Sequence, residues 1–310
     1  MPQSIVAGQG LLQPTDQDGL QVTDFDVSSP QTHFSTSRKF LNMFNRVRSM
    51  SFSSGELDSL LPDIDLQMLP TELREVYESW SQSPDCPAQY SGSVAESDWP
   101  VSIYVPERYE EGYAYPLVVW FHSDANDEDQ LEEVMSAVSS QNYIGLALRG
   151  NRQHETAGGF RWDVSSLEFG SVPLQDLLHV TTCRLRQAFH IHSERIFLAG
   201  SGYGADAALQ MLVQRPEWFA GGILLDSACK SDCLKADRLT GLRGKPVMMS
   251  VSRSCPSDML ARNVEAVRVL RSAGCNVDVE LTNHPVDPSS SEVRVLDHWM
   301  MNCINREALV

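Results

Sequence analysis

The sequence predicts an α/β protein with a mostly parallel central sheet flanked by helices. Short apolar runs of strand length alternate with amphipathic helical segments from residue 99 onward. Strands separated by helices are joined by right-handed crossovers, which place consecutive strands parallel to one another. The chain of 310 residues is long enough for one large domain of this class.

The expected strands are of two kinds. Residues 101–105 alternate apolar and polar side chains, as in a strand with one buried face. Residues 117–121 (Leu-Val-Val-Trp-Phe) form a continuous apolar run, which is typical of a strand covered on both faces. Further strands are expected at residues 144–148, 196–199, 222–225, 247–251 and 277–281. Helices are expected at residues 130–139, 174–189, 205–214, 261–272 and 292–303.

Residues 1–94 differ in composition from the rest of the chain. Ser, Gln, Asp, Pro and Thr dominate there, long apolar runs are absent, and acidic residues outnumber basic ones. Such a segment buries too little apolar area to offset chain entropy. We therefore expect a mostly disordered acidic N-terminal segment and an α/β domain over residues 95–305. Two short helices are expected within the segment, at residues 38–49 and 71–80.

The helix expected at residues 38–49 is amphipathic and basic. Its apolar residues recur at helical spacing with basic residues around them: Phe40, Met43, Phe44 and Val47, with Arg38, Lys39, Arg46 and Arg48. One interpretation is a surface for a protein partner or a membrane. The other is a helix that packs on the acidic main domain, because a helix of about 12 residues is marginal alone.

Charge and composition exclude several classes of function. The chain carries 41 acidic and 24 basic residues, a net charge of −17, and such a surface repels phosphate backbones and anionic lipid. We therefore expect no nucleic-acid binding. No apolar run reaches the ~18 residues of a transmembrane span, and the N-terminus lacks the basic and apolar regions of a secretory signal.

The cysteines bear on location and on metal binding. They are seven in number and scattered, which favours reduced thiols in the cytoplasm over a disulfide framework. Cys229 and Cys233 lie close in sequence, but no second pair or nearby histidine completes a zinc site. We expect a cytoplasmic location and no metal or other cofactor.

One glycine-rich turn carries a resemblance to a known superfamily. Residues 195–205 read Arg-Ile-Phe-Leu-Ala-Gly-Ser-Gly-Tyr-Gly-Ala, a strand that enters a helix through a sharp turn. This segment resembles the nucleophile elbow of the α/β-hydrolases. Segments similar to the carboxylesterase and phospholipase branch of that superfamily occur at residues 115–122, 142–149, 190–197 and 216–221. A phosphate-binding turn is the alternative, but the full G-x-G-x-x-G spacing is missing.

The resemblance covers residues 99–303 and implies the α/β-hydrolase fold, with ester hydrolysis by a serine, a histidine and an acid. Gly200 and Gly204 take the two glycine positions of G-x-S-x-G, so the serine position falls on Gly202. By the same resemblance the acid position falls on Cys255 and the histidine position on Asp287. The nearest residues of the required types are displaced by one or three positions: Ser201, Asp258 and His284.

The loop that forms the oxyanion hole in the family departs from its pattern as well. His122 and Ser123 stand where the family has His-Gly, and an acidic run follows: Asp124, Asp127, Glu128 and Asp129. A carboxylate near a developing anion opposes its stabilisation. The same run also suits a solvated helix start, because acidic residues favour the first turn.

These departures predict a catalytically degraded hydrolase, a pseudoenzyme, that binds a ligand or a partner. A small apolar or acyl ligand is expected in a pocket at the elbow, whose candidate residues are His122, Ser123 and Tyr203, with Ser201, Gly202 and His284. The alternative is an active carboxylic-ester hydrolase with a shifted set: Ser201, His284 and Asp258. In a third interpretation, the helix at residues 38–49 binds a partner and the domain is its platform.

Overall fold

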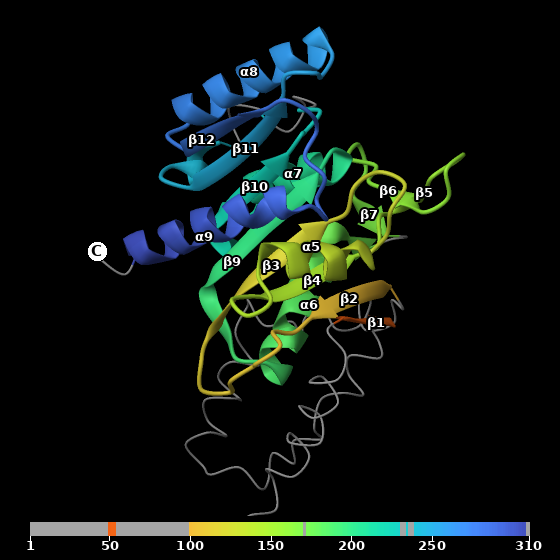
Figure 1. The fold of residues 1–310 in the computed structure, drawn as a ribbon, viewed down its shortest axis with the longest axis vertical. Coiled ribbons are helices and arrows are strands. Elements are labelled where there is room, and N and C mark those ends of the chain that lie inside the picture. Colours follow the sequence, from red (N-terminus) through yellow and green to blue (C-terminus); the bar gives the residue numbers. More distant parts are fainter. Residues whose placement is uncertain (1–48, 54–98, 170–171, 230–233, 235–238, 308–310) are drawn as a thin grey trace, which may run out of the picture.

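The computed structural model describes residues 49–53, 99–169, 172–229, 234 and 239–307. Its central element is an eight-stranded sheet (Figure 1). The strands are β1 (Ser49–Ser53), β2 (Pro100–Tyr104), β3 (Tyr115–Phe121), β4 (Ile144–Leu148), β9 (Ile191–Ser201), β10 (Gly221–Leu225), β11 (Pro246–Ser252) and β12 (Asn276–Thr282). Across the sheet they are ordered β1-β2-β4-β3-β9-β10-β11-β12.

The sheet is mostly parallel, as predicted. From β4 to β12 all neighbouring strands are parallel, whereas β2 is antiparallel to β4 and β1 is antiparallel to β2. Every strand predicted from residue 101 onward is confirmed. Strand β9 begins five residues before its predicted start at Ile196, because polar side chains at residues 192–195 interrupt the apolar pattern.

Helices cover both faces of the sheet (Figure 1). On one face lie α5 (Gln130–Val138) and α9 (Arg294–Glu307), whose buried side chains share a core with Trp120 and Phe197. On the other lie α6 (Leu174–Ala188), α7 (Tyr203–Gln214) and α8 (Ser257–Ser272), which pack on the alternate residues of the same strands. All the helices predicted between the strands are confirmed. In the described part of the chain, no helix is both long and apolar enough to cross a membrane.

Several elements are absent from the sequence prediction. Two hairpins, β5 (Arg152–Gln153) with β6 (Phe160–Arg161) and β7 (Glu168–Phe169) with β8 (Val172–Pro173), have strands too short to show a period. Three short 3-10 helices also form among the described residues: η3 (Pro216–Trp218), η6 (Thr240–Leu242) and η7 (Ser291–Val293).

Strand β1 lies inside the N-terminal segment for which we expected disorder and short helices. Its sequence, Ser-Met-Ser-Phe-Ser, pairs with β2 along its whole length. The helix predicted at residues 38–49 is wrong at Ser49, which begins this strand, and its other residues lie outside the described part. The helix predicted at residues 71–80 also lies outside it. The boundary between residues 94 and 95 stays a prediction.

The carboxyl ends of the parallel strands position the candidate site. Strands β3, β9, β10, β11 and β12 end at Phe121, Ser201, Leu225, Ser252 and Thr282. Because parallel strands end at the same edge of a sheet, the loops that follow them meet there. Most of the candidate residues named from the sequence stand in these loops.

Candidate functional site

The turn between β9 and α7 is built on three consecutive residues. Ser201 ends β9 and is buried, with 7% of its surface exposed. Gly202 follows with φ 58° and ψ −120°, in a region that side-chain-bearing residues rarely adopt, and Tyr203 begins α7. The Gly202 N–H donates to the carbonyl oxygen of Leu225 at 2.9 Å, which ties the turn to the end of β10.

The glycines on either side of this turn have no room for a side chain. A Cβ on Gly200 would lie 2.6 Å from the carbonyl group of Gly204. A Cβ on Gly204 would lie 2.2 Å from the carbonyl oxygen of Phe121. At Gly202, by contrast, a Cβ would meet no atom within 4 Å. The turn thus excludes side chains at its flanks and leaves open space only at its apex.

His122, which we expected in the pocket at the elbow, is a buried residue in the structure. It is 0% exposed. Its Nδ1 donates to the Ser123 carbonyl oxygen at 2.9 Å, and its Nε2 accepts from the Gly150 N–H at 2.8 Å, which assigns the tautomer. Burial lowers the pKa of the imidazole from 6.5 to about 4. The ring is therefore neutral at pH 7 and holds β3 to the end of β4.

The side chain of Gln130, the first residue of α5, reaches the loop in which the resemblance puts an oxyanion hole. Its side-chain Oε1 accepts from the Ser123 N–H at 2.9 Å and from Trp120 Nε1 at 3.0 Å. Its Nε2 donates to Ser123 Oγ at 2.8 Å. The Ser123 N–H is therefore already engaged within the protein. Sequence analysis missed Gln130, whose only signal was a polar amide at the first residue of a predicted helix.

Glu128 in the acidic run is neutralised by an ion pair. It is 1% exposed and accepts two hydrogen bonds from Arg149, at 2.7 Å from Nε and 2.5 Å from Nη2. The Arg149 guanidinium also lies 4.7 Å from the ring centroid of Phe160. A bidentate pair of this kind fixes geometry as well as charge. Asp124, in the same run, lies 3.5 Å from His154.

The structure does not assemble the shifted catalytic set. Asp258 stands on α8 and pairs with Arg262 at 3.0 Å. His284 is 64% exposed and pairs with Glu292 at 3.6 Å. Among the described residues, no hydrogen bond or ion pair joins any two of Ser201, Asp258 and His284.

The residues at the acid and histidine positions of the family are held by their own loops. Cys255 is half-buried, and its N–H donates to the Ser252 carbonyl oxygen at 3.2 Å. Asp287 is exposed and accepts from the N–H and the hydroxyl of Ser289, at 3.0 and 2.7 Å. These two hydrogen bonds lower the pKa of Asp287. Neither residue contacts the elbow through a hydrogen bond that the structure records.

Asp226 is a residue of the candidate site that sequence analysis missed. It follows β10 with φ 48°, and its Oδ1 accepts from the Ser252 N–H at 3.0 Å. Its Oδ2 accepts from the Val286 N–H at 2.7 Å. Burial raises its pKa, and both hydrogen bonds and the nearby His284 counter that rise. One carboxylate thus joins the ends of β10 and β11 to the loop that carries His284. The feature of the sequence that could have identified Asp226 was an acidic residue directly after a buried apolar strand.

We expect Asp226→Ala to lower the free energy of unfolding by about 2–4 kcal/mol, because it leaves two backbone N–H groups without their acceptor. Urea denaturation measures the loss, and amide hydrogen exchange should accelerate at Val286 and Ser252. Asp287→Ala is the matched control, since that carboxylate also accepts two hydrogen bonds, but only within its own exposed loop. Equal losses in the two variants would show that Asp226 does not join the strands.

Comparisons with known proteins bear on the fold. No family model matches the chain, and no curated protein is similar to it in sequence. In structure it is similar to a ferulic acid esterase at 14% identity and TM-score 0.51, over 69% of this chain and 96% of that chain. An esterase from Pyrobaculum calidifontis is similar at 10% identity and TM-score 0.49, over 77% and 99%. At 14% identity the likeness to the ferulic acid esterase concerns architecture alone, and together with the strand order and the elbow it shows that the chain has the α/β-hydrolase fold.

Proposed function

We propose that this chain is a catalytically degraded protein of carboxylesterase type that binds a ligand or a partner. The observation that carries the proposal is Gly202 at the apex of the turn, with its left-handed φ and the open space around its missing side chain. A serine esterase needs an exposed hydroxyl at this apex. Gly202 provides none, and the adjacent Ser201 is buried within β9.

The surroundings of the turn support the same proposal. An acyl-transfer site needs backbone N–H groups that are free to bind the developing oxyanion, and the Ser123 N–H is engaged by Gln130. It also needs a histidine oriented by a carboxylate. His284 instead pairs with Glu292 at the surface, and Asp258 pairs with Arg262 on the outside of α8.

The ligand that we propose for the elbow is small and apolar or acyl. The support is the open space at Gly202, together with the half-buried side chains of Ser123 in the loop after β3 and Tyr203 at the start of α7. We also propose a cytoplasmic setting, which the free cysteines of the described residues support: Cys183, Cys229, Cys255, Cys275 and Cys303. The alternative partner site at residues 38–49 rests on the sequence pattern alone.

Hydrolysis of 4-nitrophenyl acetate, butyrate and octanoate by the full chain tests the proposal. We expect no turnover above the buffer rate, and no difference between wild type and Ser201→Ala. Wild-type turnover that Ser201→Ala abolishes would establish instead the active hydrolase with the shifted set Ser201, His284 and Asp258. Covalent labelling of the wild type by a fluorophosphonate would contradict the proposal equally.

Gly202→Ser adds the missing hydroxyl and tests whether the protein also lacks a general base. A Cβ at this position meets no atom within 4 Å, so the variant should fold. We expect its ester hydrolysis to stay at the buffer rate, because His284, the candidate base, pairs with Glu292 and has no hydrogen bond to the turn among the described residues. Circular dichroism checks the fold. A rise of about a hundredfold, the lower end of general-base catalysis, would mean that a functional base is already in place.

A further inference from the structure

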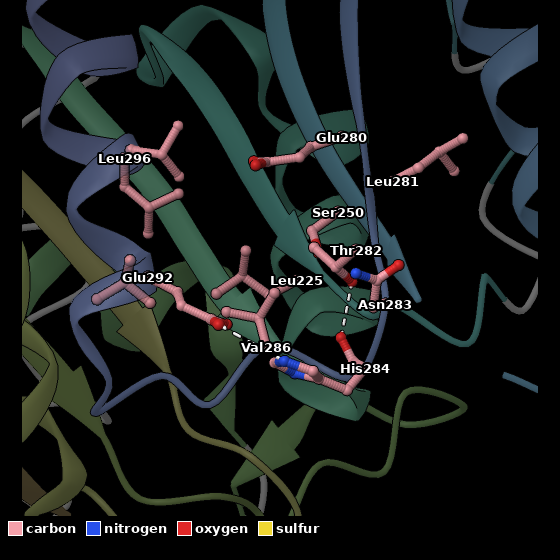
Figure 2. A pocket seen from close by; sticks show the side chains of 12 residues that line it. Leu225, Ser250, Glu280, Leu281, Thr282, Asn283, His284, Val286, Glu292 and Leu296 are labelled. Atoms are coloured by element: carbon pink, nitrogen blue, oxygen red, sulfur yellow. Dashed lines mark hydrogen bonds and ion pairs between the residues drawn. The ribbon is translucent and has the colours of Figure 1, made fainter. Parts of the chain in front are cut away.

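A pocket of about 350 Å³ lies at the carboxyl ends of β10, β11 and β12, beside α9 (Figure 2). Three of its residues form a row across the sheet, because Leu225 pairs with Ser250 and Ser250 pairs with Glu280. Neighbouring strands lie about 4.8 Å apart, so these three side chains are adjacent. The rest of the lining comes from β12, the following loop, η7 and α9, and includes His284, Val286, Glu292, Val293 and Leu296.

Ser250 gives this pocket an unused polar group. Its side chain is 1% exposed, and its Oγ has no hydrogen-bond partner. A buried hydroxyl without a partner is unfavourable, and most such groups in proteins are paired. The backbone carbonyl of Ser250 is engaged, since it accepts from the Asp226 N–H at 3.1 Å. The hydroxyl is thus held in place at the pocket wall, and its hydrogen-bonding groups are unused.

The charges around the pocket favour a cation. Glu280 and Glu292 contribute two carboxylates, and none of the lining residues is Lys or Arg. Figure 2 shows the Glu280 carboxylate extending from β12 toward Leu296 of α9, on the same side of the sheet as Ser250. The imidazole of His284 pairs with Glu292, with its Nε2 3.6 Å from that carboxylate. No other lining residue offers a cationic partner to Glu280. The chain as a whole carries a net charge of −17, which also attracts cations.

The apolar part of the pocket sets the shape of the ligand. Leu225, Val293 and Leu296 are each at most 2% exposed and border the pocket from β10, η7 and α9. Val286 adds a half-buried aliphatic side chain from the loop after β12. A site of this volume is at the lower end of the range for small-molecule pockets. It therefore suits a short aliphatic chain that ends in one cationic group.

We propose that this pocket binds a small alkylammonium ion. The ammonium group donates to Ser250 Oγ and to the Glu280 carboxylate, and the alkyl chain contacts Leu225, Val293 and Leu296. The inference goes beyond the proposed function, because it holds whether or not the elbow hydrolyses esters. The ammonium group also supplies the hydrogen-bond partner that Ser250 Oγ lacks.

Titration of the methyl-labelled full chain with hexylammonium chloride tests the proposal by NMR. We expect saturable shifts at the methyl groups of Leu225, Val286, Val293 and Leu296. 1-Hexanol and hexanoate have the same alkyl chain with a neutral or an anionic head group. Each should bind at least about tenfold more weakly, a factor that one charge-assisted hydrogen bond supplies. Equal binding of hexanol, or no saturable shift with hexylammonium, would overturn the proposal.

Two variants locate the ammonium group. Glu280→Gln should raise the dissociation constant for hexylammonium about tenfold. Ser250→Ala should weaken binding severalfold and yet raise the denaturation midpoint of the unliganded protein, because it removes a buried unpaired hydroxyl. Glu132→Gln, at an exposed position on α5, is the control for net charge and should leave binding unchanged. Unchanged binding in both pocket variants would place the ion elsewhere and contradict the proposal.

Discussion

Gly204→Ala should destabilise the protein by more than about 4 kcal/mol, a loss reached by few single substitutions. The added Cβ would lie 2.2 Å from the carbonyl oxygen of Phe121 and 2.4 Å from that of His122. Both oxygens belong to the backbone at the end of β3, so no flexible side chain can move aside. Relief requires α7 to separate from the sheet, with loss of the packing that surrounds the elbow. Urea denaturation followed by circular dichroism measures the effect.

Alanine at the other two glycines of the turn provides the matched comparison. Gly200→Ala meets the backbone of Gly204 at 2.6 Å and should be nearly as destabilising. Gly202→Ala meets no atom within 4 Å and should cost only about 1–2 kcal/mol, the strain of a side chain at its φ of 58°. If Gly202→Ala were as harmful as Gly204→Ala, the apex would not be open, and the space proposed for a ligand there would not exist.

The regular part of the fold could be predicted from the sequence because its signals are local. Residues 144–148 are uniformly apolar, and they form β4 with every residue buried. The helix predicted at residues 205–214 begins only two residues earlier, at Tyr203. The resemblance placed Gly200 and Gly204 at the two glycine positions of the turn, and the structure leaves no room for a side chain at either. Strand β1 escaped prediction because a serine-rich segment gains strand structure only by pairing with β2.

The contacts of the candidate site could not be predicted, because they join residues far apart in the sequence. Asp226 accepts hydrogen bonds from Ser252 and from Val286, and only the sheet order brings these groups together. Gln130 reaches back to Ser123 across a loop whose path the pattern does not determine. His122 was expected in the pocket because the resemblance places it in the loop that forms the family's oxyanion hole. Its hydrogen bond from the Gly150 N–H, two residues after β4, joins positions that are 28 residues apart in the sequence.

We expect His122 to make the stability of the protein depend on pH between about 4 and 6.5. Its pKa is about 4 in the folded chain and 6.5 without burial. Between these values the unfolded chain binds a proton that the folded chain does not. Its contribution to stability is therefore complete above pH 6.5 and is lost as the pH falls to 4. The shift corresponds to about 3 kcal/mol, at 1.36 kcal/mol for each pKa unit.

The test compares wild type with His122→Gln by urea denaturation at pH 7, 5.5 and 4. The substitution lowers stability at every pH, because the glutamine does not reproduce both ring hydrogen bonds. The informative quantity is therefore how the difference in free energy of unfolding between the two proteins changes with pH. Wild type should lose about 3 kcal/mol more than His122→Gln between pH 7 and pH 4. Other titrating groups are common to the two proteins and cancel in the difference. A difference that stays constant with pH would mean that His122 takes up its proton at the same pH in the folded and the unfolded chain, so that burial does not lower its pKa.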